Sequence, residues 1–160
     1  MRKRVTSSAG RPDQSDEENW LDLERLVTVE VTSEDAAYPI ESALQLGELA
    51  RDAGWRAAGP GKQRVRLLFD KPHRLRRIWL HVVEPHDERT QEFVLRWSSD
   101  VGRTFREVVR QQWHFSPSGA TAEIEDYRVD LEQVTVLELE VTPDVSGGPA
   151  PASLRRLRLA

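Results

Sequence analysis

Cysteine is absent from the 160-residue sequence, which excludes a disulfide-stabilised scaffold, catalysis by a thiol and metal centres with cysteine ligands. No apolar run approaches the roughly 20 residues that a membrane-spanning helix needs. The basic N-terminal segment MRKRVTSSAG is followed by no apolar stretch of the kind found in secretory signals. These absences predict a soluble, cytoplasmic protein with no membrane partner.

Neither sign of charge dominates, since 27 acidic residues oppose 23 basic ones and the formal net charge is −4 at pH 7. This balance argues against a protein that mainly neutralises nucleic-acid phosphates. The sequence contains no G-x-S-x-G nucleophile elbow, no phosphate-binding glycine loop and no H-E-x-x-H metal motif. We therefore expect a protein that is not an enzyme and does not bind nucleic acid.

Residues 1–19 and 20–160 differ in composition. The first segment is rich in Ser, Gly, Pro and charged residues and holds few apolar ones, so it cannot bury enough surface to offset the entropy cost of ordering. We predict a disordered N-terminal arm over residues 1–19 and one folded domain over residues 20–160. The hydrophobic content of the chain, 38%, suffices for a single core.

Apolar and polar residues alternate through most of the folded segment, as strands with one buried face require. The exception is the segment from Pro39 to Ala53, whose apolar residues recur at roughly helical spacing and predict a short helical turn. The predicted strands cover residues 27–32, 63–69, 77–83, 92–98, 104–113, 122–129, 134–142 and 153–159. This pattern predicts an all-β, eight-stranded antiparallel jelly-roll sandwich.

Loop lengths indicate where a ligand would bind. If sequence neighbours run antiparallel, successive connections fall at alternate ends of the sandwich. The connections expected at one end are the long ones, at residues 33–62, 84–91, 114–121 and 143–152. A rigid scaffold that gathers its long loops at one end is a common way to build a binding site. We therefore place the expected binding site at this long-loop end, and both chain termini at the other end.

Four groups of segments between Val27 and Leu159 carry a family resemblance. In order, they are VTVEVTSEDAAYPIESAL, GWRA with PGKQRVRLLFDKPHRLRRIWL, RTQEFVLRWSSDVGRTFREVV, and LELEVTPD with ASLRRLRLA. They resemble the opening strand and loop, the strand with a proline-containing turn, the strand with an S-x-D-G-type hairpin, and the closing strands of discoidin, or coagulation factor 5/8 C-terminal, domains. The resemblance implies the galactose-binding-like jelly roll that these domains share with carbohydrate-binding modules, and a binding function.

Many members of that family hold a calcium ion in the first loop through carboxylate and carbonyl oxygens. The corresponding segment in this sequence reads ALQLGELARDAGW. Only Asp52 in it corresponds to the family's carboxylates, so we expect no cofactor.

The candidate ligand contacts at the long-loop end are Trp55, Arg56, His86, Asp87, Arg89, Trp113 and His114. Trp55 or Trp113 would stack on a sugar ring if it is exposed, whereas a buried ring would close the end of the sandwich. The guanidinium of Arg89 offers paired donors to hydroxyls or a carboxylate, with His86 as a second donor and Asp87 orienting Arg89. Alternatively, Arg89 forms an ion pair with a neighbouring acidic residue.

The acidic run Glu123-Ile124-Glu125-Asp126 has two interpretations. Its carboxylates suit a calcium ion, but the alternation places Glu123 and Glu125 on the outer face of a strand. We therefore predict that these two side chains are solvated.

Taken together, the sequence predicts a non-catalytic module that binds a carbohydrate or another polyhydroxylated ligand at the long-loop end. The alternative is an intracellular protein-interaction or scaffold domain that presents a sheet face to a partner protein. That alternative requires an exposed apolar patch on the order of several hundred Å².

Overall fold

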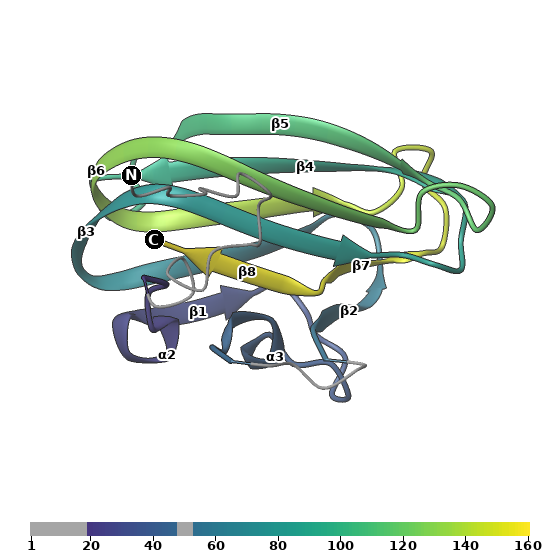
Figure 1. Cartoon of the computed structure of the whole chain (residues 1–160), viewed down its shortest axis with the longest axis horizontal. Helices are drawn as coiled ribbons and strands as arrows, with labels where there is room; N and C mark the ends of the chain where they lie inside the picture. Colours follow the sequence, from purple (N-terminus) through teal and green to yellow (C-terminus); the bar gives the residue numbers. More distant parts are fainter. Residues whose placement is uncertain (1–18, 48–52) are drawn as a thin grey trace, which may run out of the picture.

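A computed structural model describes residues 19–47 and 53–160 as a two-layered β-sandwich (Figure 1). Of the arm predicted over residues 1–19, only Asn19 lies within the described residues. The strands are β1 (Val27–Val31), β2 (Trp55–Pro60), β3 (Gln63–Val83), β4 (Arg89–Ser98), β5 (Arg106–Phe115), β6 (Ala122–Thr142), β7 (Pro151–Leu154) and β8 (Arg156–Leu159). The all-β jelly-roll prediction is therefore confirmed.

Both layers are built around the two longest strands, β3 and β6, which pair antiparallel along most of their length. In one layer, which we call the larger sheet, the first half of β3 and the second half of β6 lie within the order β1-β3-β6-β4-β5. In the other layer, the second half of β3 lies between β8 and the first half of β6. β2 and β7 form a separate two-stranded sheet. The two long strands therefore carry the chain from one layer to the other.

The bends of β3 and β6 correct the predicted strand boundaries. The sequence predicts two strands in place of each, because Asp70-Lys71-Pro72 and Gln133 interrupt the alternation. In the structure, the register shifts between Leu68 and Arg77, but pairing continues through His73, opposite Val134. Gln133 takes a positive φ of 54° at the bend of β6. These residues therefore bend β3 and β6 without ending the pairing of the two strands (Figure 1).

The short helical turn predicted in the first long loop is confirmed. Within the expected Pro39–Ala53 turn, the described residues form only α3 (Glu41–Leu44), and residues 48–52 lie outside the description. A second turn, α2 (Leu23–Leu26), was not predicted. α2 packs beside β1 and α3 packs beside β8, through buried side chains such as Leu23, Ala43 and Leu44. No helix in the described ranges has the length and apolar character needed to cross a membrane.

The core lies between the layers, where the inward residues of each strand meet. Buried side chains at alternate positions include Phe93 and Leu95 from β4, and Ile78 and Leu80 from β3. The alternation that the sequence shows is therefore the alternation of core and surface.

The long connections do gather at one end of the sandwich, as predicted. Gln63 pairs with Val141, Val83 with Ala122, and Arg89 with Phe115, so the ends of these strands lie together. The C-terminus lies at the other end, where the backbone N–H of Ala160 donates to the carbonyl of Arg77 at 3.0 Å. This arrangement leaves loops of four different connections around one end.

Candidate functional site

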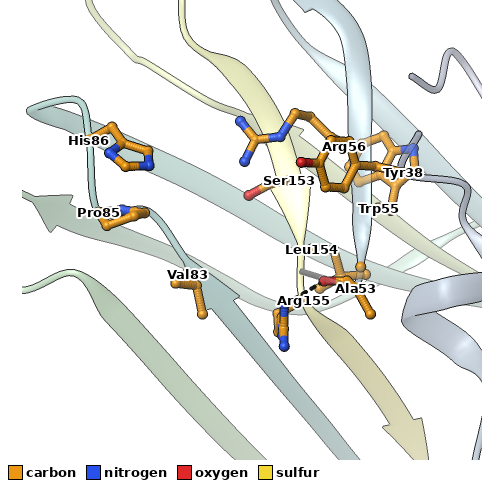
Figure 2. A pocket seen from close by; sticks show the side chains of 11 residues that line it. Tyr38, Ala53, Trp55, Arg56, Val83, Pro85, His86, Ser153, Leu154 and Arg155 are labelled. Atoms are coloured by element: carbon orange, nitrogen blue, oxygen red, sulfur yellow. Dashed lines mark hydrogen bonds between the residues drawn. The ribbon is translucent and has the colours of Figure 1, made fainter. Parts of the chain in front are cut away.

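A pocket of about 210 Å³ opens at the long-loop end. Its walls come from the segment before β2, the start of β2, the end of β3 with the following loop, and the junction of β7 and β8. The lining residues are Tyr38, Ala53, Gly54, Trp55, Arg56, Val83, Pro85, His86, Ser153, Leu154 and Arg155. Figure 2 shows Arg56 and Tyr38 on one side, His86 and Pro85 on the other, and Ser153 between them.

The close approach of β2 to β7 shapes the base of the pocket. Gly54 has a φ of +123°, and a Cβ atom there would lie 2.9 Å from the carbonyl oxygen of Leu154, so a larger residue would push the strands apart. The next residue, Trp55, pairs with Leu154 and is only 1% exposed. Its indole Nε1–H donates to the carbonyl of Ser33 at 3.0 Å.

The burial of Trp55 corrects the prediction that this ring stacks on a ligand. Its ring belongs to the core cluster, and its indole N–H is already hydrogen-bonded. Trp55 therefore closes the end of the sandwich, which is the other outcome that the sequence leaves open, and supports the pocket from beneath.

Arg56 is half-buried and lies over the ring of Tyr38, with its guanidinium carbon 5.4 Å from the ring centroid. The backbone holds the two residues together, because the N–H of Arg56 donates to the carbonyl of Tyr38 at 3.1 Å. In the part of the chain that the structure describes, the guanidinium of Arg56 makes no hydrogen bond or ion pair. It is therefore held in place by stacking, while its N–H groups are available to a ligand.

The opposite wall comes from the loop between β3 and β4. His86 is exposed and lines the pocket together with Pro85. Asp87 is also exposed but is not among the lining residues. The loop is fixed at its start, where the backbone N–H of Glu84 donates to the carbonyl of Thr121 at 2.7 Å.

A buried polar cluster lies beneath the pocket. The Nη2 of Arg89 is 2.6 Å from Oε1 of Glu84, and the two side chains are only 1% and 4% exposed. Ser153, which lines the pocket, donates its hydroxyl to the same Glu84 oxygen. Arg89 also donates to the carbonyl of Pro151 at 3.3 Å. The cluster therefore ties the start of β4 to β7.

These contacts correct the predicted role of Arg89. It is not oriented by Asp87 and does not face a ligand, because its charge is paired with Glu84 inside the protein. Glu84 was missed, although a signal existed. Leu80 and Val82 face inward at every second position, and the same period places Glu84 inward. A carboxylate at a buried position indicates that a hydrogen-bonding or charged partner lies beside it.

Trp113 also differs from the prediction. It is 5% exposed. The centroid of its ring lies 4.7 Å from that of Phe93 and 6.1 Å from that of Phe115. Its Nε1–H donates to Oε1 of Glu125 at 3.1 Å. Because alternate residues of a strand face opposite ways, the next residue, His114, is exposed. Neither residue lines the pocket.

The contact with Trp113 also corrects the solvated position predicted for Glu125. The same Oε1 accepts a hydrogen bond from the side-chain amide of Gln111 at 2.6 Å. Tyr127 donates its hydroxyl to that amide at 2.5 Å. Burial, followed by the nearby Glu125 carboxylate, raises the pKa of Tyr127 well above its ordinary range. The exposed residues of this run are instead Ile124, at 55%, and Asp126.

The described residues offer no metal centre, because no group of three or more His, Asp or Glu side chains among them is placed to hold an ion. Asp52, the carboxylate considered for calcium, lies outside the described residues. The polar groups that line the pocket include those of Arg56, His86 and Ser153, and the rings of Tyr38 and Trp55 lie beside apolar residues such as Val83, Pro85 and Leu154. Such a lining suits recognition of oxygen-rich ligands.

The apolar sheet face that a scaffold domain would need is not found among the described residues. The large apolar side chains exposed there are Leu46, Val101, Ile124 and Val145. They come from four separate segments of the chain, and the outer face of the larger sheet is charged. Exposed apolar residues scattered in this way are ordinary for a protein surface.

The fold is shared with solved carbohydrate-binding modules. One, CBM32-3 from a family 31 glycoside hydrolase of Clostridium perfringens, matches with a TM-score of 0.64 at 17% identity, covering 92% of this chain and 97% of the other. The family 32 module of C. perfringens NanJ, solved with galactose, gives 0.56 at 14% identity, covering 88% and 96%. The CBM32 of AlyQ, solved with 4,5-unsaturated mannuronic acid, gives 0.53 at 19%, covering 84% and 95%.

The sequence matches no protein-family model and no curated protein. The comparisons thus support the galactose-binding-like jelly roll, while the more specific likeness to discoidin domains stays a prediction.

Proposed function

We propose that this protein is a non-catalytic carbohydrate-binding module and that its ligand occupies the pocket at the long-loop end. The observation that carries the proposal is the stacked pair of Arg56 and Tyr38 facing His86 across that pocket. Solved proteins of the same fold include modules with sugars bound, which supports the ligand class.

The size of the pocket limits how much of a glycan it takes. Its volume, about 210 Å³, is below the roughly 300–1,000 Å³ of sites that enclose drug-sized ligands. We therefore expect one saccharide unit to enter, with the rest of the glycan in solvent. Arg56 and His86 would donate hydrogen bonds to its oxygens, and Tyr38 would present its ring edge and hydroxyl.

The test is a titration of the protein with a panel of mono- and disaccharides, in which isothermal calorimetry measures the binding. His86→Ala should weaken the binding of any positive sugar by about fivefold, the effect of losing one hydrogen bond of about 1 kcal/mol. His114→Ala is the matched control, because this second exposed histidine does not line the pocket. The proposal is wrong if no saccharide binds at millimolar concentration, or if His86→Ala leaves the affinity unchanged.

A further inference from the structure

The charge of the pocket lining is one-sided. Among the described residues that line it, Arg56 and His86 are basic, and none is Asp or Glu. Arg155 also lines it, but its Nη1 donates to the carbonyl of Ala53 at 2.7 Å. The buried carboxylate of Glu84 lies behind Ser153, where it is paired with Arg89 and accepts a hydrogen bond from the Ser153 hydroxyl. Glu84 is therefore not available to neutralise a cation in the pocket. In a chain whose net charge is −4, a binding site with this lining favours an anion.

Arg56 is the residue in this lining with the clearest capacity to hold an anion. It is half-buried, and its guanidinium is placed by the ring of Tyr38. Other arginines that are at least partly buried, such as Arg66, Arg89 and Arg96, each have a carboxylate within 3.0 Å. Within the described ranges, Arg56 has none, although it lies in a pocket where a negative group would be partly shielded from water.

The geometry of the group indicates which anion fits. A guanidinium is planar, and two of its parallel N–H groups match the two oxygens of a carboxylate. Because the stacking on Tyr38 already restrains the side chain, less rotational entropy is lost when the anion binds.

We infer that the pocket recognises an acidic saccharide, with Arg56 as the residue that binds its carboxylate. This inference rests on the proposed function and adds to it the chemical class of the sugar. The carboxylate of a uronic acid is the group expected, and a sulfate ester is the other anionic group that sugars carry.

The experiment compares each acidic sugar with an uncharged counterpart of the same ring configuration. Calorimetric titrations would use the methyl glycosides of galacturonic, glucuronic and mannuronic acid, each beside its own methyl ester, together with galactose and galactose 6-sulfate. At least one acid should bind about 10- to 100-fold more tightly than its ester, as expected when hydrogen bonds to a charged group are lost. Raising the salt concentration should reduce this ratio.

The variants assign the effect to Arg56. Arg56→Gln should bring the acid and its ester to similar affinities, and Arg56→Lys should recover only part of the difference because lysine lacks the planar fork. Arg106→Gln makes the same charge change at the exposed start of β5, at the other end of the sandwich, and should change nothing. Thermal melts would confirm that each variant is folded.

The outcomes separate the two proposals. If neutral sugars and esters bind as tightly as the acids, the assignment of an acidic ligand is wrong while carbohydrate binding stands. If Arg56→Gln keeps the difference between acid and ester, the assignment of Arg56 as the residue that binds the carboxylate is wrong. If only galactose 6-sulfate binds, the carboxylate is the wrong anion. If no sugar of either charge binds, the proposed function itself is wrong.

Discussion

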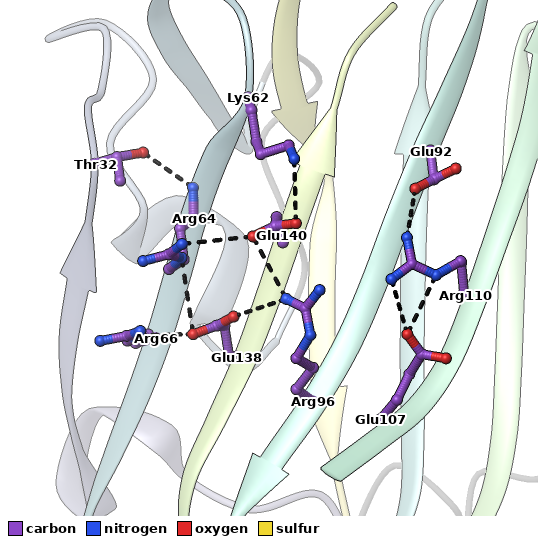
Figure 3. Close-up of polar contacts among 10 residues, drawn as sticks. All are labelled: Thr32, Lys62, Arg64, Arg66, Glu92, Arg96, Glu107, Arg110, Glu138 and Glu140. Carbon is purple, nitrogen blue, oxygen red and sulfur yellow. Dashed lines mark hydrogen bonds and ion pairs between the residues drawn. The ribbon is translucent and has the colours of Figure 1, made fainter. Parts of the chain in front are cut away.

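The outer face of the larger sheet and the pocket both contain arginines, but only the sheet face supplies carboxylates that pair with them. On the sheet face, Glu138 accepts from Arg66 at 2.7 Å and from Arg96 at 3.0 Å (Figure 3). Glu140 beside it contacts Arg96 at 3.4 Å and Arg64 at 3.5 Å. In the pocket, Arg56 rests on Tyr38 without a carboxylate from the described chain.

The difference separates charges that serve the fold from charges that are available to a ligand. Glu138 is only 4% exposed, so it loses most of its hydration on folding and needs the surrounding guanidinium groups. These arginines are therefore committed to a network within the protein. Arg56 pairs with no carboxylate of the described chain, and its position is set by the aromatic ring of Tyr38 instead.

Arg89 sharpens this comparison, because it lies near the pocket but behaves like the sheet-face arginines. Arg89→Met would leave the Glu84 carboxylate buried without its cation, and we expect a loss of about 3–5 kcal/mol in the free energy of unfolding. Urea denaturation would measure it. Its Nε and Nη1 atoms have no hydrogen-bond partner, so the pair is incompletely satisfied.

A double variant provides the control for Arg89. Replacing both members of the pair, as in Arg89→Met with Glu84→Leu, should recover much of the loss, because no buried charge remains. A single Arg89→Met variant as stable as the wild type would contradict the structural role given to this arginine.

On the sheet face, Glu138→Gln should destabilise the protein by about 1–3 kcal/mol, because several arginines lose their shared partner. The matched change is Glu107→Gln. Glu107 is 48% exposed and pairs with Arg110 alone, so its loss should cost less than about 1 kcal/mol. Equal effects in chemical denaturation would show that burial does not set the strength of this network.

Lowering the pH should gradually weaken the ion-pair network on the same sheet face. Burial opposes the ionised form of Glu140, but hydrogen bonds and charge from Arg96 outweigh it and lower the pKa of this carboxyl in the folded protein below 4.5. A lowered folded-state pKa contributes stability above the unfolded-state value, and this contribution is lost as the pH falls through the folded-state pKa.

The Glu140→Gln variant isolates that contribution. It should be less stable than the wild type at pH 7, and the gap should narrow as the pH falls below about 4.5. Thermal melts between pH 7 and pH 3 would measure it. A gap that stays constant over this range would mean that the ionised carboxylate of Glu140 contributes nothing specific.

The smallest effect on stability is expected in the pocket. Arg56→Gln removes no ion pair within the described chain, so the free energy of unfolding should change by less than about 0.5 kcal/mol, even though ligand affinity falls. A destabilisation as large as that of Glu138→Gln would place Arg56 with the structural arginines and remove the contrast between the two regions.

The sequence predicts the sandwich well because alternation reports directly on burial. Leu137, Leu139 and Val141 face the core as their spacing indicates. Strand β2 was missed because the backbone of Gly54, Gly59 and Pro60 reads as a loop, and its pairing with β7 depends on contacts distant in sequence.

The candidate site was predicted only in part. Trp55, Arg56 and His86 do line one pocket, whereas Asp87, Arg89, Trp113 and His114 do not. The long-loop end follows from strand order, but whether a side chain there faces inward depends on where each strand stops. Strand β4 begins at Arg89, three residues before the predicted start at residue 92, and its ladder therefore places Arg89 inside.

The position of the C-terminus determines how the protein can be attached to a surface. Ala160 pairs with Arg77, whereas Val83, six residues further along β3, lines the pocket. At about 3.3 Å per residue, the two points are roughly 20 Å apart along the strand. A biosensor tether joined after Ala160 would therefore hold the molecule with its pocket directed toward the flowing solution, and immobilisation through that residue should leave the binding capacity intact.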